Sequence, residues 1–434
     1  MGGVGVKKWD RGPRMRSVLL AGALLSALVA ALLSTHASAA PKGQPASKTT
    51  QRAVFVGNNW EGTADVLRFR PPSGSKPGAF TRIARLNIIP DIDQRMAEML
   101  TDPERLAYFL AIRALIGEGH NQFVDDMYST NDGRLLIVSR PSLADVVAIS
   151  FETGQIVWRF RVAGQRSDHM GLSPDGTRVA VSASTGNVVH ILDTATGQEV
   201  GTFESGDSPH ENAYSRDGSR IFHASIGLVY TPLDQPLLDT TKGERYFQVV
   251  DSQTNQILKR IDMGQKLAEA GYPDMSSAVR PMALSPDERF VYFQVSFFHG
   301  FVEYDLIEDR VTRVAELPNL IPDTPREAYL LDSAHHGIAM NGAGTKLCVA
   351  GTMSDYAAIV DRQSFSHKLL PLGEKPYWVT DSDDGEHCFI SWSGSDAVSA
   401  LSYGKETEVA RIDVGDHPQR IRTGNVRTDW VNSQ

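Results

Sequence analysis

The sequence has few cysteines and no excess of positive charge. Two cysteines in 434 residues exclude a disulfide-rich scaffold, a zinc site of four cysteines and a thiolate-held iron–sulfur cluster. Lysine and arginine number 43 against 52 aspartate and glutamate residues, a net charge of −9, which excludes a polycationic nucleic-acid-binding protein. Hydrophobic residues make up 41% and charged residues 22% of the chain, so we expect a packed globular fold.

Several catalytic motifs are also missing. The sequence contains no C-x-x-C-H haem motif, no G-x-S-x-G nucleophile elbow, no Walker A loop and no set of kinase motifs. His210-Glu211 begins like the H-E-x-x-H motif of zinc proteases, but position 214 is Tyr and the segment is a predicted strand, so the match fails. The sequence is therefore more informative about architecture and compartment than about chemistry.

The first 39 residues have the features of an export signal. Five basic side chains in residues 1–16 precede a run of 16 apolar residues, 18–33, and the cleavage pattern Ala37-Ser38-Ala39. The run is shorter than the roughly 20 residues that span a bilayer. We therefore predict a cleaved signal peptide over residues 1–39 rather than a retained anchor, and a secreted or cell-envelope protein without membrane attachment. The mature chain then has 38 basic and 51 acidic residues, a net charge of −13, and residues 40–50 are predicted to form a disordered linker.

Internal repetition is the strongest feature of the remaining sequence. Within residues 165–206, four short strands alternate with tight turns, the first of which is Ser173-Pro174-Asp175-Gly176. Similar turns end at positions 133, 176, 218, 288, 344 and 385, with gaps of 43, 42, 70, 56 and 41 residues. A period of about 42 residues is typical of a propeller blade, and the long gaps fit one blade plus an insertion.

The two ends of this repeat are predicted to share one blade. Segments 53–57, 63–69 and 81–87 supply three strands with no first strand before them, whereas residues 415–424 align with the entry to a first strand at 206–215. A C-terminal strand that completes the blade would leave no open edge in the ring. We therefore predict an all-β fold, a single seven-bladed β-propeller domain over residues 51–434 that is closed by the C-terminal strand.

Three segments carry a resemblance to a known family. The turn at 173–176, the segment 190–197 (HILDTATG) and the segment 414–418 (VGDHP) resemble bacterial secreted YVTN-type (YncE-like) β-propellers. That family is related to the haem-bearing nitrite reductase, amine dehydrogenase and lactonase propellers. The resemblance covers nearly all of residues 52–426 and implies the fold, but it does not fix an activity, because this scaffold carries many functions.

The long insertions are predicted to share one face of the propeller, which we call the top face. They cover residues 88–122, 226–245, 265–278 and 318–334. The first is predicted to be a short helical hairpin, with Thr101 and Glu104 as a capping box and Pro103 in the first turn. We expect its apolar stripe to pack on blades 1 and 2, with a movable lid as the alternative.

One position in the first strand of each blade is predicted to lie at the mouth of the axial channel, and a polar side chain occupies it in every blade. We predict a ligand-binding site here, with solvation of the channel or loop capping as the alternative; no metal and no cofactor are predicted. His169, Glu211, Trp378 and Arg420 occupy the next position. The channel-mouth residues are, in blade order, Asp125, Asp168, His210, Arg280, His336, Tyr377 and Gln419.

Other side chains leave alternatives open. Cys348 and Cys388 lie in second strands of adjacent blades, a placement compatible with a disulfide or with two separate buried thiols. Trp60, Tyr272 and Trp378 lie in or beside top-face loops and are candidates for stacking on a sugar.

Two functions are compatible with these features. The first is a secreted, non-catalytic propeller, a monomer that binds a partner protein or a small ligand on its top face. The second is an enzyme, either a lactonase-like hydrolase or a cofactor-bearing redox propeller, that uses the His, Arg and Asp side chains at the channel mouth. No catalytic residue is assigned.

Overall fold

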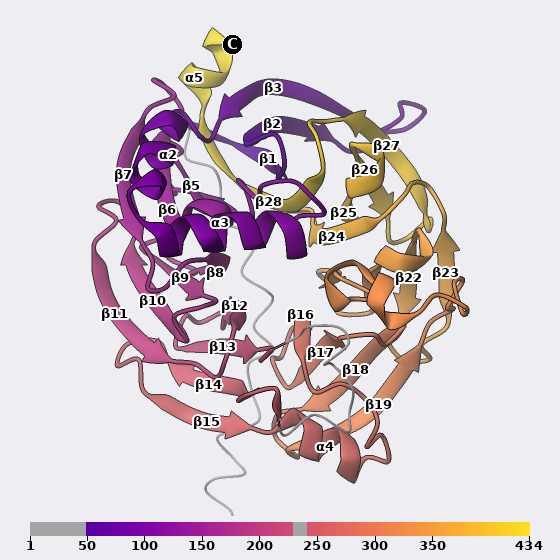
Figure 1. Cartoon of the computed structure of the whole chain (residues 1–434). Helices are drawn as coiled ribbons and strands as arrows, with labels where there is room; N and C mark the ends of the chain where they lie inside the picture. Colours follow the sequence, from indigo (N-terminus) through magenta and orange to yellow (C-terminus); the bar gives the residue numbers. More distant parts are fainter. Residues whose placement is uncertain (1–48, 229–240) are drawn as a thin grey trace, which may run out of the picture. The chain divides into compact units, whose positions relative to one another are not determined.

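The computed structural model describes residues 49–228 and 241–434. Within them, strands β1 to β28 form seven four-stranded antiparallel sheets, which are arranged as blades around a common axis (Figure 1). The predicted all-β, seven-bladed propeller is confirmed. No helix in this part of the chain is both long and apolar enough to span a bilayer.

Blade 1 contains both ends of the propeller. Its sheet consists of β28 (Pro418–Arg427), β1 (Thr50–Asn58), β2 (Thr63–Arg70) and β3 (Ala79–Asn87), in that order. β28 runs antiparallel to β1, with Ala53 opposite Gly424 and Val56 opposite Ile421, so the predicted closure by the C-terminal strand is confirmed. β1 begins at Thr50, inside the predicted linker. The predicted signal peptide and residues 40–48 lie outside the described residues.

Six blades of four consecutive strands follow in chain order. Blades 2 to 4 consist of β4 (Met127–Ser129), β5 (Leu135–Arg140), β6 (Asp145–Ser150), β7 (Ile156–Arg161), β8 (Ser167–Leu172), β9 (Arg178–Ala183), β10 (Val188–Asp193), β11 (Glu199–Glu204), β12 (Pro209–Tyr214), β13 (Arg220–Ser225), β14 (Phe247–Asp251) and β15 (Ile257–Ile261). Blades 5 to 7 consist of β16 (Val279–Leu284), β17 (Phe290–Val295), β18 (Gly300–Asp305), β19 (Arg310–Glu316), β20 (Ile338–Met340), β21 (Lys346–Gly351), β22 (Tyr356–Asp361), β23 (His367–Leu370), β24 (Pro376–Asp381), β25 (His387–Trp392), β26 (Ala397–Ser402) and β27 (Thr407–Asp413).

The repeated turn fixes the hairpin between the first two strands of a blade. Ser173 Oγ donates a hydrogen bond to Asp175 Oδ1 at 2.6 Å, and the same carboxylate oxygen accepts the amide N–H of Thr177 at 3.0 Å. Gly176 has a φ of 71°, a conformation that only glycine adopts without steric cost. The Ser-to-Asp hydrogen bond recurs at Ser215 and Ser382. One local signature therefore produces the same hairpin in several blades.

The hydrophobic core lies between neighbouring blades. Val146 of blade 2 and Val181 of blade 3, for example, belong to one fully buried cluster. Phe55 of blade 1 stacks on Phe151 of blade 2 with ring centroids 5.8 Å apart, and Trp430 of the C-terminal helix α5 (Thr428–Ser433) packs against the same Phe151 ring. Each blade is thus held by apolar contacts with the next one around the ring.

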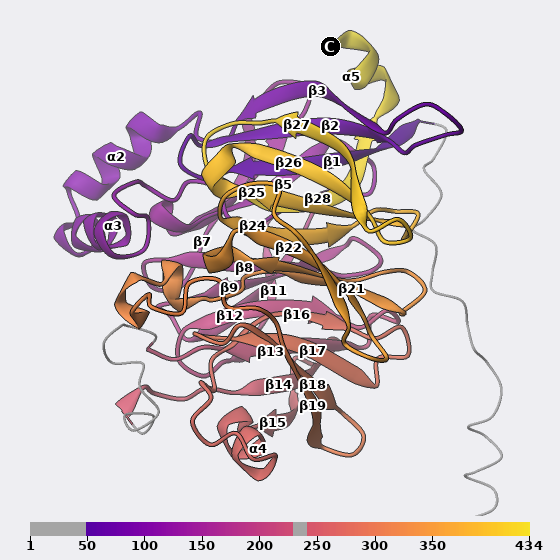
Figure 2. The same ribbon diagram turned by 90° about the vertical axis from the view of Figure 1, so that its right-hand side faces the viewer.

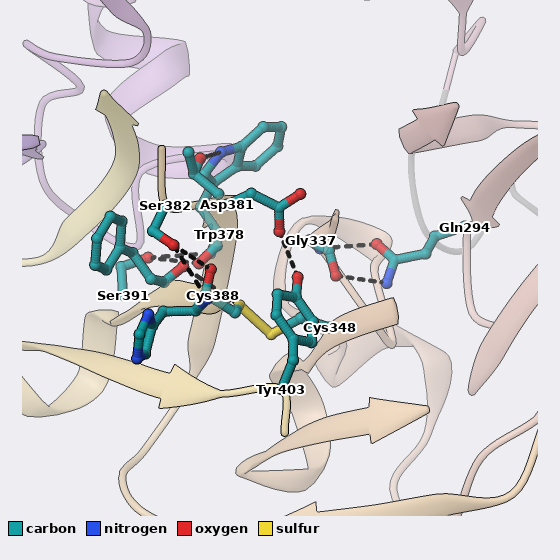
Figure 3. The surroundings of a disulfide bond; sticks show 12 residues. Gln294, Gly337, Cys348, Trp378, Asp381, Ser382, Cys388, Ser391 and Tyr403 are labelled. Atoms are coloured by element: carbon teal, nitrogen blue, oxygen red, sulfur yellow. Dashed lines mark hydrogen bonds between the residues drawn. A yellow bond between two sulfur atoms is a disulfide. The ribbon is translucent and has the colours of Figure 1, made fainter. Parts of the chain in front are cut away.

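A disulfide bond joins blades 6 and 7 (Figure 3). Cys348 on β21 and Cys388 on β25 are bonded, and their Cα atoms are 6.4 Å apart, within the range that a disulfide spans. Of the two alternatives that the sequence left open, the structure shows the bridge. Beside it, the Tyr403 hydroxyl donates a hydrogen bond to the Asp381 carboxyl group.

Within the described residues, short helices lie in or beside the insertions that precede blades 2, 5 and 6. α2 (Ile92–Leu100) and α3 (Pro103–Leu115) precede blade 2, α4 (Met263–Glu269) precedes blade 5, and the 3-10 turns η3 (Arg326–Ala328) and η4 (Leu330–Asp332) precede blade 6. Figure 2 shows α2 and α3 projecting from one side of the blades. In the insertion at 226–245, residues 229–240 lie outside the described residues.

The predicted helical hairpin is confirmed, but its predicted cap is wrong. Asp102, not Thr101, caps α3, because the Asp102 carboxylate accepts the backbone N–H of Arg105 at 3.2 Å. Pro103 occupies the first turn as predicted. Met99 and Phe109 pack on Leu143 of blade 2, so the apolar stripe of the hairpin lies against the propeller.

Candidate functional site

The candidate site begins with the same irregularity in the first strand of every blade. In β8, Asp168 and His169 together stand opposite the single residue Ser182 of β9, which is a β-bulge. Corresponding register shifts occur in β12, β16, β24 and β28. In blade 2, the backbone of Ser139 forms hydrogen bonds with the backbone of both Asp125 and Asp126. In blade 6, the backbone of Ala350 does the same with His336 and Gly337. The seven pairs are Asp125–Asp126, Asp168–His169, His210–Glu211, Arg280–Pro281, His336–Gly337, Tyr377–Trp378 and Gln419–Arg420.

The first members of the seven pairs meet around one cavity of about 340 Å³. All seven side chains predicted from the sequence line it, one from each blade, and each belongs to a buried residue. A bulge bends the strand and redirects its side chains, which brings two consecutive residues toward the axis where a regular strand would bring one. The predicted residues lining this cavity are Asp125, Asp168, His210, Arg280, His336, Tyr377 and Gln419.

Insertions form the rest of the cavity wall. α3 and the residue after it contribute mainly apolar side chains to the wall. Residues of the 226–245 and 318–334 insertions also line the cavity. The cavity therefore has a polar floor at the channel mouth and a partly apolar wall. The wall residues from α3 and the 318–334 insertion are Tyr108, Ala111, Ile112, Leu115, Ile116, Glu327, Tyr329, Leu331 and Asp332.

Three histidines from blades 3, 4 and 6 converge on the floor. One ring nitrogen from each of His169, His210 and His336 lies within 4.8 Å of the corresponding nitrogens of the other two. The His169 and His210 rings have centroids only 3.8 Å apart. Burial lowers the pKa of all three imidazoles well below the usual range, and the charges of nearby arginines lower it further. Burial therefore favours the neutral form of each ring, in which one nitrogen carries a lone pair.

Two carboxylates lie beside this histidine cluster. Asp168 accepts hydrogen bonds from Arg166 Nη1 at 2.8 Å and from Ser184 Oγ at 2.6 Å, which hold its carboxyl group in place. Burial raises the pKa of Asp125 to about 7, against the opposing charge of Arg420. Burial therefore favours the protonated form of the Asp125 carboxyl group.

Three of the second members of the pairs, Glu211, Trp378 and Arg420, form a layer of charged and aromatic groups under the floor. Glu211 Oε2 lies 2.7 Å from His169 Nδ1, and burial raises the Glu211 pKa to about 8. Arg420 lies over the Trp378 ring, 3.6 Å from its centroid, and donates to Asp125 Oδ1 at 3.3 Å. Arg420 also contacts His169 Nε2. This layer holds the floor side chains in fixed orientations.

Two of the three aromatic candidates for sugar stacking are unsuitable. Trp60 is stacked between His120 and His417, with centroids 3.9 and 3.8 Å away, so both of its faces are covered. Trp378 is buried under Arg420. Tyr272 is 37% exposed and lines a separate cavity of about 310 Å³.

His169 was predicted only as a neighbour of the channel-mouth residues, although it lines the cavity and completes the histidine cluster. Arg166 and Gln122, whose side chains are joined by a 3.2 Å hydrogen bond, also line the cavity and were missed. The recurrence of two consecutive polar residues in the first strands was the available signal for His169, because a regular strand would have presented only one of them to the axis.

Comparisons with known proteins bear on the fold. No protein-family model matches the chain, and no curated protein matches it in sequence. Among solved structures, a chain of hydrazine synthase from Kuenenia stuttgartiensis is similar, with 15% identity and a TM-score of 0.53, over 70% of this chain and 96% of that chain. At this identity the similarity shows the propeller fold alone. The resemblance to YVTN-type propellers stays a prediction.

Proposed function

We propose that this protein is a secreted β-propeller of the YVTN type that binds a small molecule, without chemical conversion, in the cavity at its channel mouth. The observation that carries the proposal is the convergence of seven polar side chains from seven blades on one cavity. Its volume of about 340 Å³ falls within the range of small-molecule sites, which are concave and combine apolar walls with a few fixed polar groups.

The lining favours a ligand with two dissimilar ends. The floor offers neutral imidazoles, the Tyr377 hydroxyl and the Gln419 amide, all of which form hydrogen bonds. Ile112 and Leu115 of α3 offer apolar contact on the wall. We expect a polar group of the ligand to face the floor and an apolar part to face α3. A concave site of this kind suits a small ligand better than the flat surface of a partner protein.

Secretion forms part of the same proposal. It is supported by the signal-like residues 1–39 and by the Cys348–Cys388 disulfide, since disulfides persist mainly in oxidising compartments.

A pair of alanines on α3 allows a direct test of binding. Ala111 lines the cavity, whereas Ala114 is exposed and lies outside its lining. Ala111→Trp should fill the cavity, and Ala114→Trp should leave it unchanged. Wild type and both variants would be screened by thermal unfolding against lactones, sugars, amino acids and dicarboxylates. We expect at least one compound to raise the melting temperature of wild type and Ala114→Trp but not of Ala111→Trp. Equal stabilisation of all three proteins, or none by any of these compounds, would contradict the proposal.

One observation favours a second candidate function, a lactonase-like hydrolase. The His169–Glu211 hydrogen bond resembles the carboxylate-oriented imidazole that serves as a general base in hydrolases. Assays with lactones and esters would detect it. Turnover that disappears in His210→Ala, Arg280→Ala or His336→Ala would establish catalysis at the channel mouth, and turnover unaffected by all three changes would exclude these residues from it.

A further inference from the structure

We propose that His169, His210 and His336 bind one divalent transition-metal ion on the floor of the cavity. This inference rests on the proposed function in that it uses the same cavity as a binding site. The three histidines come from blades 3, 4 and 6, which the ring closure brings together although up to 167 positions separate them in the sequence. In Figure 1, β8 and β12 lie on the inner sides of their blades.

The first argument is the distance between possible ligand atoms. One nitrogen from each ring lies within 4.8 Å of the other two. Zinc–nitrogen bonds of about 2.0–2.1 Å place two nitrogens of a tetrahedral site about 3.4 Å apart. Small side-chain rotations therefore suffice to close the three rings around an ion. Because all three residues are buried, the rings have few other positions to adopt.

The second argument is that ring nitrogens of the cluster lack hydrogen-bond partners. Nδ1 of His210 and Nδ1 of His336 are buried and unpartnered, as is Oδ2 of the adjacent Asp125. Buried polar atoms nearly always have a partner, and each exception calls for an explanation such as an ion. A cation bound at the cavity floor would account for these three unpartnered atoms.

The third argument is the carboxyl group behind His169. A metal-bound histidine almost always uses its second ring nitrogen to bond to a carboxylate or carbonyl group. Glu211 occupies that place, 2.7 Å from His169 Nδ1, and leaves Nε2 as the coordinating nitrogen. Nε2 lies 3.5 Å from Asp168 Oδ1, at the cavity lining.

Arg420 sets a condition for metal binding. Its guanidinium contacts His169 Nε2 from the layer under the floor, and it does not line the cavity. Coordination through Nε2 requires Arg420 to give up this one contact. Its hydrogen bond to Asp125 and its stacking on Trp378 can hold it in the lower layer when it does so.

The donor set selects the class of metal. Imidazole nitrogens suit zinc, copper, iron, cobalt and nickel, whereas magnesium and calcium prefer sites made of oxygen ligands. Three protein nitrogens leave at least one coordination position for water or for a ligand atom, and that position faces the cavity. A small molecule bound in the cavity would then present an anionic or neutral oxygen to the ion.

The test uses the full chain after chelator treatment, with Cu²⁺ as the probe. We expect one tightly bound Cu²⁺ per chain, and pulsed electron paramagnetic resonance should detect at least two imidazole nitrogens coordinated to it. His210→Asn and His336→Asn should each weaken Cu²⁺ affinity by about 100-fold or more. Glu211→Gln should weaken it by roughly 10-fold, the effect expected of a group that orients a metal ligand. The control is His367→Asn, which changes an exposed histidine and should leave the affinity unchanged.

Two outcomes would overturn the metal site. One is a wild-type Cu²⁺ spectrum with fewer than two imidazole nitrogens, which needs no variant to fold. The other is equal affinity in wild type, His210→Asn, His336→Asn and His367→Asn. The result is separable from the proposed function: if Cu²⁺ fails these criteria while Ala111→Trp still blocks a compound that stabilises wild type, small-molecule binding stands without the metal. Specific Cu²⁺ binding with no stabilising compound would leave the metal site and remove the small-molecule proposal.

Discussion

The guanidinium group of Arg422 forms a two-pronged ion pair with the carboxylate of Asp126, with N–O distances of 2.8 and 2.7 Å. The pair joins β28, the strand that closes the ring, to the residue directly before β4 in blade 2. Asp126 is fully buried, and the Arg422 side chain is 15% exposed. Removal of one partner of such a pair leaves an uncompensated buried charge.

We expect Asp126→Asn and Arg422→Met each to lower the free energy of unfolding by about 3–5 kcal/mol. The double variant should lose less than the sum of the two, because it leaves neither charge unpaired. Denaturant unfolding of the four proteins gives this interaction energy. As a control, Glu308→Gln alters the exposed Glu308–Arg310 pair and should change stability by less than about 1 kcal/mol. Strictly additive losses would show that Asp126 and Arg422 act independently.

The disulfide between Cys348 and Cys388 should stabilise the contact between blades 6 and 7. It closes a loop of 40 residues, for which the chain-entropy model gives about 4 kcal/mol. We expect the double variant Cys348→Ala/Cys388→Ala to unfold with a free energy about 2–4 kcal/mol lower than that of the oxidised wild type. A reducing agent should lower the stability of wild type and leave the double variant unaffected. Equal stability of the oxidised and reduced wild type would contradict this role.

Asp381 should make stability depend on pH. Burial raises the pKa of Asp381 to about 7, although the Tyr403 hydrogen bond opposes the shift, whereas the unfolded chain has the usual value near 4. Between these values the folded protein holds a proton that the unfolded chain has released. The contribution of Asp381 is therefore complete below about pH 4 and is lost as pH rises through 7.

The matching variant is Asp381→Asn, which removes this titration. Between about pH 4 and 7, the free energy of unfolding of wild type relative to Asp381→Asn should fall by up to about 4 kcal/mol. Urea unfolding at a series of pH values measures the difference. A difference that is constant with pH, or that grows as pH rises, would show that the carboxyl group does not titrate in this way.

Ring closure by β28 predicts a graded effect of truncation. Removal of residues 428–434 deletes α5 and with it Trp430, which packs on Phe151. We expect this to cost about 3 kcal/mol, as for other losses of a buried aromatic side chain. Removal of residues 418–434 also deletes the strand paired with β1 and exposes an unpaired sheet edge. This shorter chain should show no cooperative unfolding transition, as judged by circular dichroism, and a cooperative transition would contradict the closure.

The blade count and the closure could be predicted from sequence because both follow from short-range signals. The turn around Gly176 requires a residue that tolerates positive φ, and its recurrence gives the period directly. The closure was predictable because the N-terminal segments supply only three strands of blade 1, and residues 415–424 align with the entry to the first strand of another blade.

The seven cavity residues were also predictable, because the same turn fixes the register of each first strand. His169 was not assigned to the cavity, because two consecutive residues of one strand reach it only through a bulge, which is defined by the backbone of two strands. The cap of α3 was missed for a related reason. Asp102 and Thr101 are both good N-cap residues, and only the backbone geometry selects between them.

The doubled residue in each first strand has a consequence for how this scaffold can change. Six hairpins and the β28–β1 pair each place two adjacent residues near the axis, and the supporting hydrogen bonds are made by the backbone. A substitution in one blade can thus alter recognition while the backbone of the other six pairs keeps its place. Side chains at the channel mouth can therefore be replaced one at a time on an unchanged backbone, by evolution or by protein engineering.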